Sequence, residues 1–253
     1  ETSQKIKGLS ILPSKESSPK TNDSFLNYQW ALDNNGQIIY KDIDDIHLEE
    51  RLGKEGVDIN FSAGSVDSNI KRDIIVAVLD SGLDIHHKDL KDNIFTNEVE
   101  CKNGRVITRP KKDNDNNGYK GDCKGWDFTS RKKEGQNRVS DKLGHGTHVA
   151  GVIKFNGEPV TEDISSPLLL MGLKYYDSNS SAQKNLDSTV KAIRYAIKMK
   201  VDIINYSSGG RYPSHQEKAA IALAKKKGIL FITAAGNNGA DTDKKAYYPA
   251  AYK

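Results

Sequence analysis

The run Ile74-Ile-Val-Ala-Val-Leu79 is the feature that most narrows what this chain can fold into. It is apolar without interruption, whereas a strand with one face in water alternates apolar and polar side chains. Unbroken apolarity is typical of a central strand in a parallel sheet, because such a strand is buried on both faces. The run ends at Asp80-Ser81-Gly82. Ligands gather at the carboxyl ends of strands in open α/β sheets, so this end is a candidate functional site.

Other stretches complete the pattern of an α/β protein. Apolar runs predict further buried strands over 167–173, 201–206 and 228–235, and helical spacing covers 183–200 and 214–227. Strands and helices that alternate along the chain imply a mostly parallel central sheet with helices on both faces. We therefore expect an α/β fold with its site at the carboxyl edge of the sheet.

A histidine between two glycines stands in the stretch Gly144-His145-Gly146-Thr147-His148-Val-Ala-Gly151. The glycines permit a tight turn and a close approach of backbones, and the apolar residues that follow predict a buried helix. His145 would begin that helix beside a cleft, where an oriented imidazole can move a proton near neutral pH. His148 would belong to the packed part of the helix. Two alternatives stay open: a histidine that only caps the helix, and a metal-binding His145/His148 pair.

Two further polar residues follow predicted strands. Asp80 comes directly after the central strand, where a carboxylate is well placed to hold an imidazole. Capping of the next helix and a phosphate-accepting or metal-holding carboxylate are the alternatives. Asn237 follows the run 228–235, and a side-chain amide at a strand end can donate a hydrogen bond to an oxyanion. An asparagine in a turn beside glycine is its alternative.

Three strings taken in order resemble the motifs of the subtilisin-like serine proteases (subtilases, peptidase S8). They are Val-Ala-Val-Leu-Asp80-Ser-Gly-Leu-Asp84, His145-Gly-Thr-His-Val-Ala-Gly151 and Ala-Ala-Gly-Asn237. The resemblance spans residues 25–253 and implies a three-layer subtilisin-like fold. Residues 1–24 are rich in Lys, Ser and Pro and lack periodicity, so we expect them to form a flexible leader. The resemblance also implies serine endopeptidase activity on proteins or peptides. Asp80 would orient His145, His145 would act as the general base, and Asn237 would line the oxyanion hole.

The nucleophilic serine of this family stands in a Gly-Thr-Ser-Met-Ala type of string, and no such string occurs in the sequence. We therefore expect the serine and the C-terminal part of the fold to lie outside these 253 residues, and this fragment alone to be inactive. A chain that begins with Glu1 is also expected to be a piece of a longer protein. One alternative is a nicked protease, in which a second chain carries the serine. Another is a non-catalytic peptide-binding protein. A propeptide is a further possible partner.

A run of small residues follows the predicted strand 201–206, with the sequence Ser207-Ser208-Gly209-Gly210. Exposed backbone at a strand end can add a peptide as a further strand. The resemblance implies that these four residues bind substrate beside the scissile bond. Tyr206 and Ser208 replace the methionine and leucine that are commoner in the family, so the wall of the substrate pocket differs from the usual one.

The loop Asp113-Asn-Asp115-Asn-Asn117-Gly118 carries oxygen ligands at alternate positions, as the first half of an EF-hand does. Lys124 stands where an EF-hand has its closing glutamate, so the loop is not an EF-hand. It resembles the loop that precedes Gly-Trp-Asp-Phe in many subtilases and commonly binds calcium. The resemblance implies bound structural Ca²⁺, and the ligands expected in this loop region are Asp113, Asp115, Asn117 and Asp122. It also implies that Asp89, in the string that follows the Asp80 motif, holds a structural calcium. A solvated turn is the alternative.

The two cysteines and the overall composition bear on the surroundings of the protein. Cys101 and Cys123 bracket a polar segment, and we predict that they form a disulfide in a secreted or periplasmic protein; two free thiols are the alternative. A net charge of +4 with both signs interspersed gives little reason to expect a nucleic-acid partner. The sequence has no apolar run long enough to predict a membrane span.

Overall fold

The computed structural model describes residues 31–32, 34–36, 38–41, 50–59, 72–108, 110–130, 136–155 and 168–253. The chain divides into two compact units, and each is described here by itself. One comprises residues 1–71 and 158–165, and the other comprises residues 72–157 and 166–253. Asp80, His145 and Asn237 all belong to the second unit.

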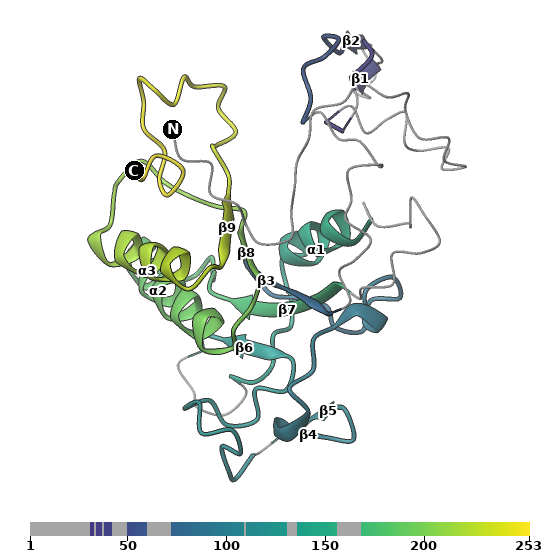
Figure 1. Cartoon of the computed structure of the whole chain (residues 1–253), viewed down its shortest axis with the longest axis vertical. Coiled ribbons are helices and arrows are strands. Elements are labelled where there is room, and N and C mark those ends of the chain that lie inside the picture. Colours follow the sequence, from purple (N-terminus) through teal and green to yellow (C-terminus); the bar gives the residue numbers. More distant parts are fainter. Residues whose placement is uncertain are drawn as a thin grey trace. The chain divides into compact units, whose positions relative to one another are not determined.

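A five-stranded sheet forms the centre of the second unit (Figure 1). Its strands are β3 (Ile74–Asp80), β6 (Gly125–Asp127), β7 (Leu168–Lys174), β8 (Ile203–Tyr206) and β9 (Leu230–Thr233). They lie in the order β6-β7-β3-β8-β9, and every neighbouring pair is parallel. The apolar run therefore forms the middle strand of a parallel sheet, as the sequence predicts.

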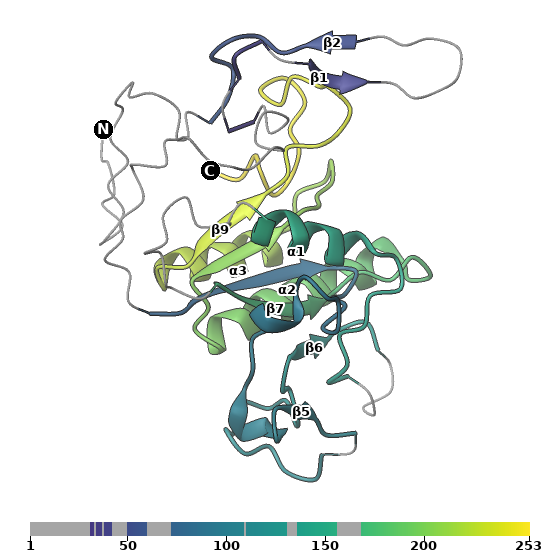
Figure 2. The same cartoon turned by 90° about the vertical axis from the view of Figure 1, so that its right-hand side faces the viewer.

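Helices cover both faces of this sheet, as the two views show (Figures 1 and 2). Helix α1 (His145–Phe155) lies on one face. Helices α2 (Ala182–Lys198) and α3 (His215–Lys226) pack against each other on the opposite face. The three-layer α/β fold expected from the sequence is therefore confirmed.

The side chains of β3 alternate between two hydrophobic cores. Val76 and Val78 pack in the core on the side of α1, and Ala77 and Leu79 pack in the core on the side of α2 and α3. All four are at most 3% exposed. Full burial of a valine or leucine side chain stabilises a fold by roughly 1.5–3 kcal/mol, so both layers of helices hold β3 in place.

Two segments are less buried than the sequence predicts. In β9, Leu230 is 43% exposed and Ile232 is 44% exposed, whereas Phe231 packs on the α3 side. In α1, Val152 is 52% exposed. Leu230 and Ile232 are exposed because β9 is the last strand of the sheet, and within the described residues only its α3 side is covered. An apolar run reports hydrophobicity but not whether a layer lies over each of its faces.

The start of α3 is capped by three residues that act together. The Ser214 hydroxyl accepts a hydrogen bond from the backbone N–H of Glu217 at 3.3 Å. The backbone N–H of Ser214 donates to the Tyr252 hydroxyl at 2.7 Å, and that hydroxyl donates to the Glu217 carboxylate at 2.8 Å. In an ordinary capping box the glutamate side chain would accept directly from the backbone N–H of the N-cap residue, here Ser214. Burial raises the pKa of Glu217, and the hydrogen bond from Tyr252 offsets part of that rise.

We predict that Tyr252→Phe lowers the free energy of unfolding by about 1–3 kcal/mol, because it removes a partner from the buried Glu217 carboxylate. A carboxyl whose pKa is raised by folding costs stability once it ionises, so this loss should grow as the pH rises from acidic to neutral. Denaturant unfolding at both pH values measures it. Tyr212→Phe is the control, because the Tyr212 side chain is 90% exposed. Equal losses in the two variants would contradict the prediction.

The first unit contains β1 (Ile38–Lys41) and β2 (Glu50–Leu52), which pair antiparallel. Leu52 therefore lies in a strand. The predicted leader, residues 1–24, lies outside the described residues. Among the helices that the structure describes, none has the length and apolarity needed to cross a membrane.

Candidate active site

Asp80 and His145 are in direct contact. The Nδ1 atom of His145 lies 2.7 Å from Oδ1 of Asp80, and the same oxygen accepts the backbone N–H of Ser81 at 2.7 Å. Asp80 ends β3 and its side chain is 6% exposed, whereas the His145 side chain at the start of α1 is 58% exposed. A carboxylate accepts a hydrogen bond from Nδ1–H, so the neutral ring keeps Nε2 as the basic nitrogen.

Gly146 allows the first turn of α1 to approach the end of β3. A Cβ atom at this position would overlap the Gly82 carbonyl oxygen and would lie 2.9 Å from the Cβ of Asp80. The backbone N–H of Gly146 also donates to the Ser81 hydroxyl at 3.1 Å. The contact between Asp80 and His145 therefore depends on a residue without a side chain next to the histidine.

Asp141 fixes the same turn from the other side. Its carboxylate accepts hydrogen bonds from the Ser81 hydroxyl at 2.9 Å, from the Gly144 N–H at 2.9 Å, and from the N–H and hydroxyl of Thr147 at 2.9 and 2.8 Å. Burial raises the pKa of Asp141, but these hydrogen bonds outweigh it and lower the pKa overall. No role was predicted for Asp141 from the sequence. An aspartate just before a glycine-flanked helix start is the signal that could have identified it.

The three candidate elements meet at one edge of the sheet. Leu79 of β3 is in register with Tyr206 of β8, and Tyr206 is in register with Thr233 of β9. Because these strands are parallel, the residues that follow them emerge on the same side. Asn237 is exposed in the loop after β9, so it leaves the sheet at the edge where Asp80 ends β3.

The expected substrate segment, Ser207–Gly210, follows β8 directly. The Ser207 hydroxyl accepts from the Asn205 amide at 2.8 Å, and the Ser208 carbonyl accepts from the Thr233 hydroxyl at 3.3 Å. Gly210 exchanges two backbone hydrogen bonds of 2.7 Å with Tyr248. We expected the backbone N–H and carbonyl of Gly210 to bind a substrate strand, but both are already bonded to Tyr248. The sequence analysis did not foresee this long-range pairing.

His148 differs from its expected position. It was expected to belong to the packed part of the helix, but it is exposed, because it falls on the solvent side of α1. Its substitution should therefore have little effect on folding. His145, its partner in the alternative metal site, is engaged with Asp80. Neither histidine belongs to the group of potential metal ligands found among the described residues.

The model of the Subtilase family (peptidase S8) matches residues 71–253. The chain belongs to the subtilase family. The matched region contains Asp80, His145, Ser207–Gly210 and Asn237. It begins at residue 71, so a catalytic domain that starts at residue 25 stays a prediction.

Relatives of this subtilase include an intracellular and an extracellular protease. The major intracellular serine protease of Bacillus subtilis (strain 168) is 35% identical over 186 residues, or 72% of this chain and 49% of that protein. The minor extracellular protease Epr of the same organism is 37% identical over 114 residues, or 44% of this chain and 17% of that protein. Among solved structures, a lanthipeptide protease is 24% identical over 71% of this chain and 46% of that chain, with a TM-score of 0.48. The chain thus spans about half the length of the first relative.

A cluster of oxygen atoms lies in the polar loop of this subtilase. Ligand atoms of Glu100, Asp113 and Asp115 all lie within 4.8 Å of one another. The amide of Asn117 donates to Asp115 at 2.9 Å and to Asp122 at 2.7 Å, so four of the five expected ligands gather here. Hard cations such as Ca²⁺ prefer oxygen ligands, so the donor set fits calcium.

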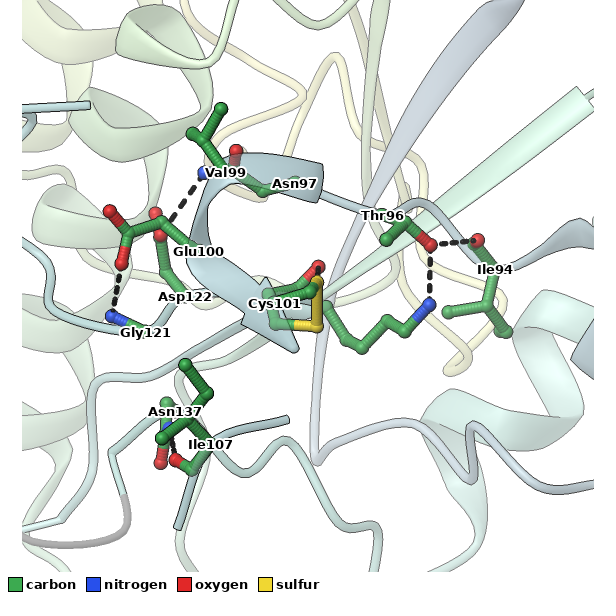
Figure 3. The surroundings of a disulfide bond; sticks show 12 residues. Ile94, Thr96, Asn97, Val99, Glu100, Cys101, Ile107, Gly121, Asp122 and Asn137 are labelled. Carbon is green, nitrogen blue, oxygen red and sulfur yellow. Dashed lines mark hydrogen bonds between the residues drawn. A yellow bond between two sulfur atoms is a disulfide. The ribbon is translucent and has the colours of Figure 1, made fainter. Parts of the chain in front are cut away.

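Glu100 is the member of this cluster that the sequence analysis missed. It is fully buried, and its Oε2 accepts the backbone N–H of Gly121 at 2.7 Å (Figure 3). Glu100 ends the short 3-10 helix η4 (Glu98–Glu100), which lies outside the loop whose spacing predicted the site. Asp89, by contrast, forms an ion pair with Lys88 at 2.8 Å, and it is not among the clustered carboxylates of the described residues.

Asp122, beside this cluster, is harder to ionise than an exposed aspartate. Burial raises its pKa to about 6, and the nearby carboxylates of Asp115 and Glu100 add to the rise. The Tyr195 hydroxyl donates to Asp122 at 2.6 Å and opposes the rise in part. A bound cation would stabilise the ionised carboxylates that burial and mutual repulsion disfavour.

Cys101 and Cys123 form a disulfide, as predicted, with their Cα atoms 5.0 Å apart (Figure 3). Cys101 directly follows Glu100, and Cys123 directly follows Asp122. The disulfide therefore connects the backbone beside Glu100 to the backbone beside Asp122.

We predict that Gly146→Ala separates His145 from Asp80, because the new methyl group would overlap the Gly82 carbonyl oxygen. Thermal unfolding should show a loss of stability, and NMR should show that the His145 ring has lost its hydrogen bond. Gly151→Ala is the control in the same helix, because a Cβ atom there meets nothing within 4 Å. That variant should be neutral or more stable by up to about 1 kcal/mol, since alanine favours a helix over glycine. Similar effects of the two substitutions would contradict the proposed packing constraint.

Proposed function

We propose that this protein is a serine endopeptidase in which Asp80 and His145 activate a serine from outside these 253 residues. The observation that carries the proposal is the 2.7 Å contact between His145 Nδ1 and the buried Asp80 carboxylate, at the carboxyl edge of a subtilase sheet. An imidazole held in this way has one defined tautomer and one free basic nitrogen. The expected string around the nucleophile does not occur in the sequence, and the chain spans 49% of the intracellular relative.

In the proposed mechanism, His145 Nε2 takes the proton of the serine hydroxyl as the serine oxygen attacks the peptide carbonyl carbon. The electron pair of the carbonyl bond moves to its oxygen, and the amide of Asn237 donates a hydrogen bond to that oxyanion. Asp80 stabilises the imidazolium. His145 then returns the proton to the departing amine, and the peptide bond breaks to leave an acyl-enzyme. A water molecule, deprotonated by His145, releases the acid and restores the serine.

The proposed substrates are proteins and peptides, bound along the segment Ser207–Gly209 after β8. The free backbone of a strand end can pair with an extended peptide. Secretion is part of the same proposal, because disulfides persist in oxidising compartments and Cys101 is bonded to Cys123. A propeptide, or a second chain that carries the serine, is a proposed partner.

We predict that, in the full-length protein, Asn237→Ala lowers kcat by about 10²–10³, because one oxyanion donor is lost, with little change in KM. His145→Ala should abolish hydrolysis. His148→Ala is the matched control, because this exposed histidine lies on the same helix and should be dispensable. Steady-state hydrolysis of a protein substrate measures all three. A folded full-length protein that binds peptides without cleaving them would replace the proposal with a peptide-binding function.

The proposal includes a structural calcium ion in the polar loop. Glu100, Asp113 and Asp115 supply clustered carboxylates, with Asn117 and Asp122 beside them. A cation at this position would offset the repulsion that raises the pKa of Asp122. Its role would be to order a loop that has few apolar side chains, and it takes no part in the proposed chemistry.

We predict that a chelator lowers the thermal midpoint of the protein, because a ligand bound only to the folded state stabilises it by about 2.7 kcal/mol at 100 times its Kd. Asp115→Asn should remove most of this chelator-sensitive part. Asp92→Asn is the control, because it removes an exposed carboxylate from outside the loop. An unchanged midpoint in excess chelator, together with no metal by elemental analysis, would rule out the calcium site.

A further inference from the structure

A cavity lies between the segments that follow β8 and β9. Arg211, which comes directly after the substrate segment, lines one side. Ala235 and Asn238, which flank Gly236 and Asn237, line the other, and Lys245 and Tyr247 are also among the lining residues. The cavity therefore lies beside the proposed oxyanion donor and the proposed substrate segment.

Position decides which part of a substrate would enter this cavity. In the proposed mechanism the amide of Asn237 contacts the oxygen of the carbonyl that is attacked. That carbonyl belongs to the residue on the N-terminal side of the scissile bond. Since the cavity is lined by the two neighbours of the Gly236-Asn237 pair, the side chain of the same substrate residue is the one that reaches it.

The charge of the cavity is positive. Arg211 and Lys245 line it, and of the described residues that line it none is acidic. The neighbouring carboxylate of Asp241 is paired with Lys244 at 2.9 Å. Within the described part of the chain neither Arg211 nor Lys245 forms an ion pair, so both cations are available to a substrate.

The ring of Tyr247 is part of the lining of the cavity. A Cβ atom on Gly209 would lie 2.5 Å from Cε1 of Tyr247, and one on Gly236 would lie 3.5 Å from the same ring. The ring thus lies against the backbones of both glycines and occupies the space between the two walls. A large aromatic side chain of a substrate would compete with the Tyr247 ring for this space.

We propose that Arg211 and Lys245 make this cavity select an acidic side chain on the substrate residue whose carbonyl is attacked. The inference rests on the proposed function and adds to it a substrate class. The guanidinium of Arg211 can form two charge-assisted hydrogen bonds to a carboxylate, and the ammonium of Lys245 adds a second positive charge. Both cations are exposed, so the preference is sensitive to salt.

Cleavage of matched internally quenched peptides by the full-length protein tests this inference. The peptides differ only at the residue before the scissile bond, which is aspartate, asparagine or phenylalanine. Because asparagine has the shape of aspartate without its charge, the Asp-to-Asn ratio of kcat/KM isolates the effect of charge. We expect a ratio of about ten at low salt, in line with a charge-assisted hydrogen bond, and a smaller one at about 1 M salt.

Three variants separate the residues involved. The double variant Arg211→Gln, Lys245→Gln should bring the Asp-to-Asn ratio to about one. Lys218→Gln is the matched control, because this exposed lysine of α3 does not line the cavity, and it should leave the ratio unchanged. Tyr247→Gly should raise cleavage of the phenylalanine peptide relative to the asparagine peptide by about tenfold or more, since a larger pocket accepts the ring.

Three outcomes would count against the inference, and they can be told apart. If the unaltered protein cleaves the aspartate and asparagine peptides equally, the selectivity is wrong while the proposed protease function stands. If it cleaves neither the peptides nor any protein substrate, and a fluorophosphonate does not label it, the proposed function and the inference both fail. A ratio that persists in the double variant would also overturn the assignment to Arg211 and Lys245.

Discussion

The close contact between the first turn of α1 and the end of β3 is the constraint on which the candidate site depends. Asp80 is fixed by the sheet and His145 by the helix, so their 2.7 Å contact exists only if the two backbones meet without an intervening side chain. Gly146 provides this space, and the Asp141 carboxylate accepts hydrogen bonds from the backbone N–H groups of the same turn. Packing and polar capping therefore act together to orient one imidazole.

The parallel sheet brings the other candidate site segments to the same edge. The segments after β3, β8 and β9 leave the sheet side by side because the three strands run in one direction and are in register. A deeply buried carboxylate is costly unless it has partners, and Asp80 has both an imidazole and a backbone N–H. In the second acidic region, backbone and amide groups donate to Glu100 and Asp122, but burial still raises the pKa of Asp122 to about 6.

The sequence predicted the features that local pattern determines and missed those that depend on long-range contacts. Unbroken apolarity identified β3, and the strand-end aspartate and glycine-flanked histidine identified Asp80 and His145. The contribution of Glu100 to the oxygen cluster and the pairing of Gly210 with Tyr248 depend on segments brought together only by folding. The exposure of His148 and of β9 was predicted wrongly, because hydrophobicity does not say which face another layer covers.

Mapping the serine that a fluorophosphonate probe labels in the full-length protein tests the central claim most directly. The measurement is mass spectrometry of labelled peptides from the unaltered protein and from the Asp80→Asn and His145→Ala variants. The account predicts a single labelled serine outside residues 1–253, strongly reduced labelling in Asp80→Asn, and none in His145→Ala. A labelled serine within these residues, or labelling that persists without His145, would contradict it.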